Sequence, residues 1–236
     1  MKKSHIVMLL TFLLLIPATI YFGLRFSGRA YYVTSTLVMI ETLVPFLLAF
    51  ENRKPQAREL VVLAVMCALA VAGRVAIPIP SFKAIFGIIM IAGIAFGPES
   101  GFLVGAISAL ASNFFYSQGP YTPWQMMAYG AGGMLAGFVF AEGRLPRKPV
   151  VMGIFGFLAV AFFVGPLLDT CSVFLVMSRI SLKGAMAFYI SGFPVNLRQA
   201  VATAIVLLVL GKPLLEKLDR IKTKYGILDD EGRKEA

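Results

Sequence analysis

Residues 83–115 read KAIFGIIMIAGIAFGPESGFLVGAISALASNFF, and this stretch decides the fold class. Lys83 and Glu99 are its only charged residues. A helix needs about 20 mostly apolar residues to cross a bilayer, and the Gly97-Pro98 pair is typical of a turn. The stretch therefore predicts two membrane helices, the first of them short. Glu99 suits the N-terminal end of the second helix.

The composition of the whole chain supports the same class. Of its 236 residues, 58% are hydrophobic and only 14% are charged, whereas soluble domains carry roughly 25% charged residues. So few charges cannot cover a water-exposed surface, and lipid must be the solvent for most of the chain. Cys67 and Cys171 lie in apolar stretches and are interpreted as buried small hydrophobes. We therefore predict an all-α integral membrane protein.

Apolar segments separated by polar loops predict about eight transmembrane helices. They cover residues 6–24, 32–50, 59–77, 83–96, 100–115, 124–141, a seventh segment from 150, and 193–210. The polar loop 51–58 is the best internal boundary. It divides the chain into an N-terminal helix pair with its loop (1–57), a six-helix core (58–211) and a polar tail (212–236). Residues 169–192 predict either an extension of the seventh helix or an interfacial segment.

The net charge of +10 follows the predicted topology. Fifteen Lys and Arg residues lie in segments on the same side as the termini, and five lie on the other side. Because cytoplasmic loops carry the excess of basic residues in membrane proteins, we expect both termini in the cytoplasm. The same distribution argues against a nucleic-acid partner, since the charges follow the loops instead of forming one binding face.

Residue sets typical of enzymes are absent from the sequence. The only histidine, His5, stands at the N-terminal end, so no histidine-based metal or Ser/His site is possible. No GxxxxGK[ST] motif occurs, so ATP hydrolysis must lie on a partner. We expect no catalytic residue, metal or cofactor. The alternative energy source is an ion gradient acting through Glu41 or Asp169, although a satisfied hydrogen bond within the bundle is favoured for Glu41.

Small residues recur at four-residue spacing in several of the predicted helices. Such spacing lets helix backbones approach closely in a bilayer. Packing inside one bundle is the simpler interpretation, and a docking face for another membrane subunit is the alternative. The residues are Ala64, Ala68 and Ala72, then Gly93, Gly97, Gly101 and Gly105, and Gly133 with Gly137.

Polar and aromatic residues are concentrated at the predicted outer ends of the helices. Charges at membrane depth usually face a cavity or a partner, so this end predicts a pocket for an organic ligand, with Trp124 and Tyr129 as stacking faces. The alternative is that the aromatic residues are interfacial anchors and that Arg74 pairs with Asp169. The residues are Arg74, Lys83, Asn113, Tyr116, Gln118, Trp124, Gln125, Tyr129, Asp169, Asn196, Arg198 and Gln199.

Residues 58–212 resemble, in three features, the substrate-binding S components of energy-coupling factor (ECF) transporters, which import vitamins. Ala64-Val-Met-Cys-Ala68 matches the A-x-x-x-A coupling motif of that family. SQGPYTPWQM, at residues 117–126, is similar to a G-Q-G-P-W-T-P-W-Q-M stretch of one subgroup. The order of six compact hydrophobic segments is the third feature.

The resemblance implies a substrate-capturing subunit in a bacterial or archaeal cell membrane. Its partners would be a transmembrane coupling protein (the T component) and two cytoplasmic ATPases, and the alanines would form the docking face. The ligand would bind in an extracellular pocket, and the subgroup points to cobalamin or a corrinoid precursor. The two helices before the core depart from the six that are usual in the family. The substrate-binding residues would be Arg74, Asn113, Gln118, Trp124, Gln125, Tyr129, Asp169, Asn196 and Arg198.

Overall fold

The computed structural model describes the core of the chain and a few residues before it. The described residues are 10–15, 18, 19, 21, 37, 40, 41, 56–119, 121–177 and 181–227. The predicted N-terminal helix pair (6–24 and 32–50) therefore lies almost entirely outside the described residues. Within them, all regular structure is helical, which confirms the all-α class.

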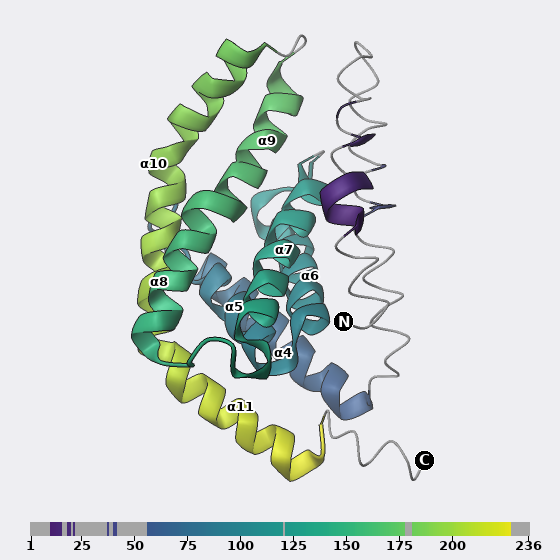
Figure 1. The fold of residues 1–236 in the computed structure, drawn as a ribbon, viewed down its shortest axis with the longest axis vertical. Helices are drawn as coiled ribbons and strands as arrows, with labels where there is room; N and C mark the ends of the chain where they lie inside the picture. The colour runs from purple at the N-terminus through teal and green to yellow at the C-terminus, as the bar shows by residue number, and fades with distance from the viewer. Residues whose placement is uncertain are drawn as a thin grey trace.

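The core consists of six continuous helices in the part of the chain from residue 56 to 227 (Figure 1). Two of them, Pro149–Val176 and Leu182–Tyr225, are individually long and apolar enough to cross a bilayer, and each contains one π-helical turn. The first four are α4 (Ala57–Val75), α5 (Ile85–Phe96), α6 (Pro98–Tyr116) and α7 (Thr122–Phe140). The fifth combines α8 (Pro149–Ala159), η3 (Val160–Val164) and α9 (Gly165–Val176), and the sixth combines α10 (Leu182–Val206), η4 (Leu207–Gly211) and α11 (Lys212–Tyr225).

The segment 169–192 extends two helices and contains no separate interfacial element among its described residues. The seventh predicted helix continues to Val176, and the last one begins at Leu182. The prediction that the last span starts at Phe193 is therefore wrong. Ser181 explains the earlier start, because its hydroxyl accepts a hydrogen bond from the backbone N–H of Gly184 and caps the helix.

Helix α5 lies at the centre of the core. All twelve of its residues are buried, and it contacts α4, α6, α7 and α10. A helix that is apolar on every face must be surrounded by other helices or by lipid. The uniform hydrophobicity of residues 85–96, read from the sequence as a short membrane span, therefore also reflects burial by neighbouring helices.

Glycines let α5, α6 and α7 touch through their backbones. A Cβ on Gly93 would lie 2.1 Å from the carbonyl oxygen of Gly133, and one on Gly101 would lie 2.5 Å from the same oxygen. A Cβ on Gly105 would lie 2.4 Å from the carbonyl oxygen of Tyr129. We call Gly93, Gly101, Gly105 and Gly133 the glycine seam. For these residues, packing inside one bundle is the correct interpretation.

The chain reverses between α5 and α6 at Gly97-Pro98, and this reversal leaves carbonyl groups to be satisfied. Gly97 has a φ of 92°, which favours glycine. Pro98 has no N–H, so the carbonyl of Ile94 has no helical donor four residues on. Arg147 Nη2 donates to this carbonyl (3.1 Å), and Lys222 Nζ donates to the carbonyl of Ala95 (2.7 Å).

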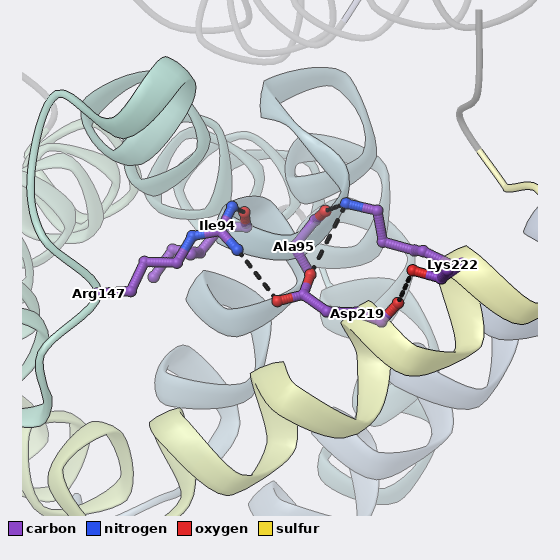
Figure 2. A network of polar contacts seen from close by, with 6 residues as sticks. Ile94, Ala95, Arg147, Asp219 and Lys222 are labelled. Carbon is purple, nitrogen blue, oxygen red and sulfur yellow. Dashed lines mark hydrogen bonds and ion pairs between the residues drawn. The ribbon is translucent and has the colours of Figure 1, made fainter. Parts of the chain in front are cut away.

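Helix α11 crosses this end of the bundle and supplies part of that network (Figures 1 and 2). Asp219 lies between the two cations, with its Oδ2 3.3 Å from Arg147 Nη1 and its Oδ1 3.9 Å from Lys222 Nζ. Leu215 and Leu218 of α11 are buried against the core. The sequence predicted only a polar tail here, whereas the structure has an amphipathic helix of 14 residues.

Candidate functional site

A polar cluster occupies the end of the bundle opposite α11. The C-terminal ends of α4 and α6 meet the N-terminal end of α7 there, and residues 117–121 join α6 to α7. Arg74 on α4, Asn113 on α6 and Gln125 on α7 are linked by hydrogen bonds. These three residues were predicted from sequence to share a site, and the structure brings them together.

Hydrogen bonds hold Arg74 firmly in this cluster. Its Nη1 donates to Ser112 Oγ (2.5 Å) and to Asn113 Oδ1 (2.8 Å). Asn113 Nδ2 donates in turn to Gln125 Oε1 (2.8 Å) and Thr122 Oγ1 (3.1 Å). The side chains of Ser112 and Asn113 are fully buried. A connected network of buried polar groups restricts the positions of its members.

Two tyrosine rings flank the Arg74 guanidinium group. Its central carbon lies 4.9 Å from the ring centre of Tyr116 and 5.6 Å from that of Tyr129. Both distances fall within the range of cation–π attraction. The Tyr116 hydroxyl donates to the Arg74 carbonyl (3.0 Å), and Lys83 Nζ lies 5.8 Å from the Tyr116 ring centre. Two cations therefore converge on one aromatic ring.

The polar groups of the loop before α7 bind to one another and to α6. Gln118 Oε1 accepts a hydrogen bond from Thr122 (2.9 Å), and Gln118 Nε2 donates to the carbonyl of Leu110 (3.0 Å). The hydroxyl of Tyr121 donates to the carbonyl of Ser117 (2.7 Å), whose φ of 78° is uncommon for a serine. Gln118 thus fixes the loop against α6.

Trp124 lies inside the bundle, with 2% of its surface exposed. Its ring stacks on Phe174 of α9 at 5.6 Å between ring centres, and it packs with Met127 and Cys171. Its indole Nε1 is buried and has no hydrogen-bond partner among the described residues. The sequence predicted a ligand-stacking face or an interfacial anchor, whereas the structure places the ring between α7 and α9.

A second polar cluster lies between α9 and α10. Asn196 Nδ2 donates to Asp169 Oδ2 (2.7 Å), and both line a cavity of about 120 Å³. Gln199 also lines it, and its buried Oε1 has no hydrogen-bond partner in the described part of the chain. Phe86 borders the cavity and packs edge-on against Tyr129 at 4.5 Å, which connects the two clusters.

Two predictions about the site residues are not matched by the structure: the position of Arg198, and an ion pair between Arg74 and Asp169. Arg198 is exposed on α10, and its Nε donates to the carbonyl of Pro194 within the same helix. Arg74 and Asp169 do not pair, because each is bound to an amide side chain of its own cluster. The structure therefore places Arg198 apart from both clusters.

Three further members of the two clusters were not predicted from the sequence. They are small hydroxyl residues, which carry no signal of their own in an apolar helix. Ser112 precedes Asn113, and Thr122 lies within the stretch 117–126, so proximity to a predicted residue was the available signal. The three residues are Ser112, Thr122 and Ser172.

The alanine face of α4, formed by Ala64, Ala68 and Ala72, is exposed. Ala68 and Ala72 line an open apolar groove of about 490 Å³ between α4 and α6, together with Cys67, Val71, Val75, Ala111 and Phe115. Phe115 is 68% exposed. No described residue of the bundle fills this groove, in contrast to the glycine seam.

Glu41, the candidate proton carrier, accepts a hydrogen bond from Thr19 (2.6 Å). Its second carboxylate oxygen is buried and has no hydrogen-bond partner among the residues that the structure describes. Across those same residues, no group of three His, Cys, Asp or Glu side chains could hold a metal ion. What the clusters offer instead is hydrogen bonding, positive charge and aromatic surface, which are means of binding a small molecule.

The core helices match a known protein family. A family model described as the S component of an ECF-type riboflavin transporter matches residues 54–216. The matched segment covers all six core helices up to the start of α11. No curated protein and no solved structure matches the chain.

Proposed function

Because the chain belongs to the family of S components of ECF-type riboflavin transporters, we propose that it binds its vitamin ligand between the Arg74 cluster and the Asp169 cluster. An S component is the substrate-binding subunit of an ECF vitamin transporter, an integral protein of the cytoplasmic membrane and not an enzyme. The observation that carries the proposal is that seven of the nine predicted binding residues lie in two connected clusters, at or near the end of the bundle away from α11. They are Arg74, Asn113, Gln118, Gln125, Tyr129, Asp169 and Asn196.

The orientation of this end follows from charge. Arg144, Arg147 and Lys148 lie between α7 and α8, at the same end as the basic helix α11. Cytoplasmic segments carry the excess of Lys and Arg, so we assign this end to the cytoplasm. The polar clusters then face the extracellular side, where a captured vitamin enters.

Riboflavin is the first ligand to test, because the family description names it. Phe86, which lines the cavity beside Asp169 and packs against Tyr129 of the first cluster, offers an aromatic contact for its planar ring system. Asp169 and Asn196 supply an acceptor and an amide beside it. Cobalamin or a corrinoid precursor is the second candidate, supported by the similarity of residues 117–126 to the subgroup linked to these ligands.

The energy source in this proposal is a T component with two ATPases. No nucleotide-binding loop occurs in the sequence, and the exposed alanine face offers a docking surface for the T component. The ion-gradient alternative requires a carboxylate that binds and releases a cation. Asp169 and Glu41 are the candidates, and each is hydrogen-bonded to a neutral side chain.

Ligand binding and uptake are measured separately to test the proposal. The purified protein in detergent should quench riboflavin fluorescence without ATP, and Asn196→Leu should weaken this binding because it leaves Asp169 without its donor. Uptake into proteoliposomes should require the T component, the ATPases and ATP. Gradient-driven uptake by this chain alone would contradict the proposal and favour the secondary transporter.

A further inference from the structure

Among the described residues, the Arg74 guanidinium group donates hydrogen bonds from Nη1 alone. Both of its hydrogen bonds to described residues come from Nη1, to Ser112 Oγ and Asn113 Oδ1. Nε and Nη2 donate to no described residue. The Nε and Nη2 edge is a fork of two parallel N–H groups, whose geometry matches two oxygens of a carboxylate or a phosphate.

No ion pair between described residues neutralises the positive charge of this cluster. Three ion pairs between described residues, Arg147–Asp219, Lys212–Glu216 and Lys222–Asp219, lie at the opposite, α11 end. Within the part of the chain that the structure describes, Arg74 binds neutral oxygens alone, and Lys83 Nζ donates to the carbonyl of Ile77.

Lys83 shares the Tyr116 ring with Arg74, so two like charges lie close together without a described carboxylate beside them. Bringing like charges together is unfavourable, and a charge removed from water needs a partner of opposite sign. An anion placed against Arg74 would meet both requirements.

We propose that the Nε and Nη2 edge of Arg74, assisted by Lys83, binds an anionic group of the transported molecule, a carboxylate or a phosphate ester. Tyr116 and Tyr129 hold the guanidinium plane, and Ser112 and Asn113 fix its rotation, so the free edge is oriented before the ligand arrives. The inference rests on the proposed function for the nature of the ligand, and it narrows the substrate to an anionic vitamin or a phosphorylated one.

The first test uses inorganic phosphate, which needs no knowledge of the ligand. We expect phosphate to raise the melting temperature of the purified protein more than chloride at equal ionic strength, and Arg74→Gln to abolish the difference. Acetate in place of phosphate distinguishes a carboxylate site from a phosphate site. Arg144→Gln, which removes an exposed arginine at the opposite end, is the matched control and should keep the full phosphate effect.

Arg74→Lys covers the case in which Arg74→Gln does not fold. It keeps the cation but loses the fork, so the phosphate effect should fall without disappearing. An unchanged phosphate effect in Arg74→Lys and Arg74→Gln would overturn the proposal, and so would the absence of any phosphate effect in the wild-type protein.

A second test compares riboflavin with riboflavin 5′-phosphate, which differ by one anionic group. The wild-type protein should bind the phosphate ester at least about tenfold more tightly, a difference of about 1.4 kcal/mol. Arg74→Gln should remove this preference, measured as the ratio of the two affinities in the same variant.

Failure of the anionic-ligand proposal and failure of the proposed ligand give different results in these tests. Binding of riboflavin with no preference and no phosphate effect would overturn the anionic site but leave the proposed function. An Arg74-dependent phosphate effect without binding of either flavin would support the anionic site and contradict riboflavin as the ligand.

Discussion

The glycine seam and the alanine face have the same spacing in the sequence but opposite positions in the structure. Gly93 and Gly101 meet the backbone of Gly133 so closely that a single Cβ would overlap with it. Ala64 and Ala68, one helical turn apart on α4, are exposed. Small residues four positions apart therefore indicate that a close contact is possible on that face, but not which helix makes it.

The difference also separates two kinds of close contact. The seam joins helices of one chain, so its contacts form whenever the chain is folded. The alanine face lies beside an apolar groove that no described residue fills, so a contact there would come from lipid, from a protein partner or from the part of the chain outside the described residues. Substitutions in the seam should therefore act on folding, and substitutions on the face should act on assembly.

The largest effect is expected in the seam. In Gly133→Ala the new Cβ would lie 2.3 Å from the carbonyl oxygen of Gly101, and backbone atoms cannot move aside as a flexible side chain can. Overpacking of a core costs about 1–3 kcal/mol and occasionally more, and this contact belongs at the upper end. We expect little monodisperse protein after detergent extraction, measured by size-exclusion chromatography.

The adjacent glycine provides the control for this substitution. A Cβ on Gly132 would meet only the Val164 side chain at 3.0 Å and Met90 Cε at 3.9 Å. Gly132→Ala should therefore lower the melting temperature by a few degrees at most, because alanine also favours the helix. Equal losses in Gly132→Ala and Gly133→Ala would contradict the backbone contact between α6 and α7.

The sequence predicted the helices well where apolar residues are continuous, as in α4 to α7. It did not predict α11, because Leu215 and Leu218 are separated by charged residues and no apolar run marks the helix. The boundary near residue 181 was also missed, since a serine cap depends on a local conformation that hydropathy does not show.

The sequence predicted which residues belong to the candidate site better than it predicted which of them contact one another. Arg74 and Asn113 were expected together, and they are hydrogen-bonded. The alternative pairing of Arg74 with Asp169 depends on which helix faces which, and residue types alone cannot decide that. Trp124 shows the same difficulty, because its stacking partner Phe174 is 50 positions away in the sequence and lies on another helix.

An intermediate effect is expected on the alanine face. Ala64→Trp combined with Ala68→Trp should leave the fold and riboflavin binding intact, because both positions are exposed and lie away from the polar clusters. Co-purification with the T component should be lost, since the close approach of helices requires small side chains. Ala70→Trp is the contrast, because Ala70 is fully buried and its replacement should prevent folding.

The two alanine results together decide between the interpretations of the face. Normal ligand binding with lost co-purification would support docking. Poor expression of the double variant, at the level of Ala70→Trp, would instead show that the face is packed in the folded protein. Normal co-purification of a folded double variant would show that the T component does not dock on this face.

The smallest effect is expected at the edge of the groove, where two neighbouring phenylalanines form a matched pair. Phe115 lines the groove beside Ala68 and Ala72, whereas Phe114 does not, although both are largely exposed. A T component seated in the groove would cover the Phe115 ring, and truncation of a buried aromatic residue at an interface costs about 1–2 kcal/mol. Phe115→Ala should therefore weaken the affinity for the T component about fivefold to thirtyfold, measured with both proteins in nanodiscs.

Phe114→Ala loses the same ring at a position outside the groove and should leave this affinity unchanged. Neither substitution should alter the melting temperature by more than a degree or two, because little of either ring is packed against the core. If the two variants weaken assembly equally, the contact is not made through this groove, and the docking surface must be sought elsewhere on α4 and α6.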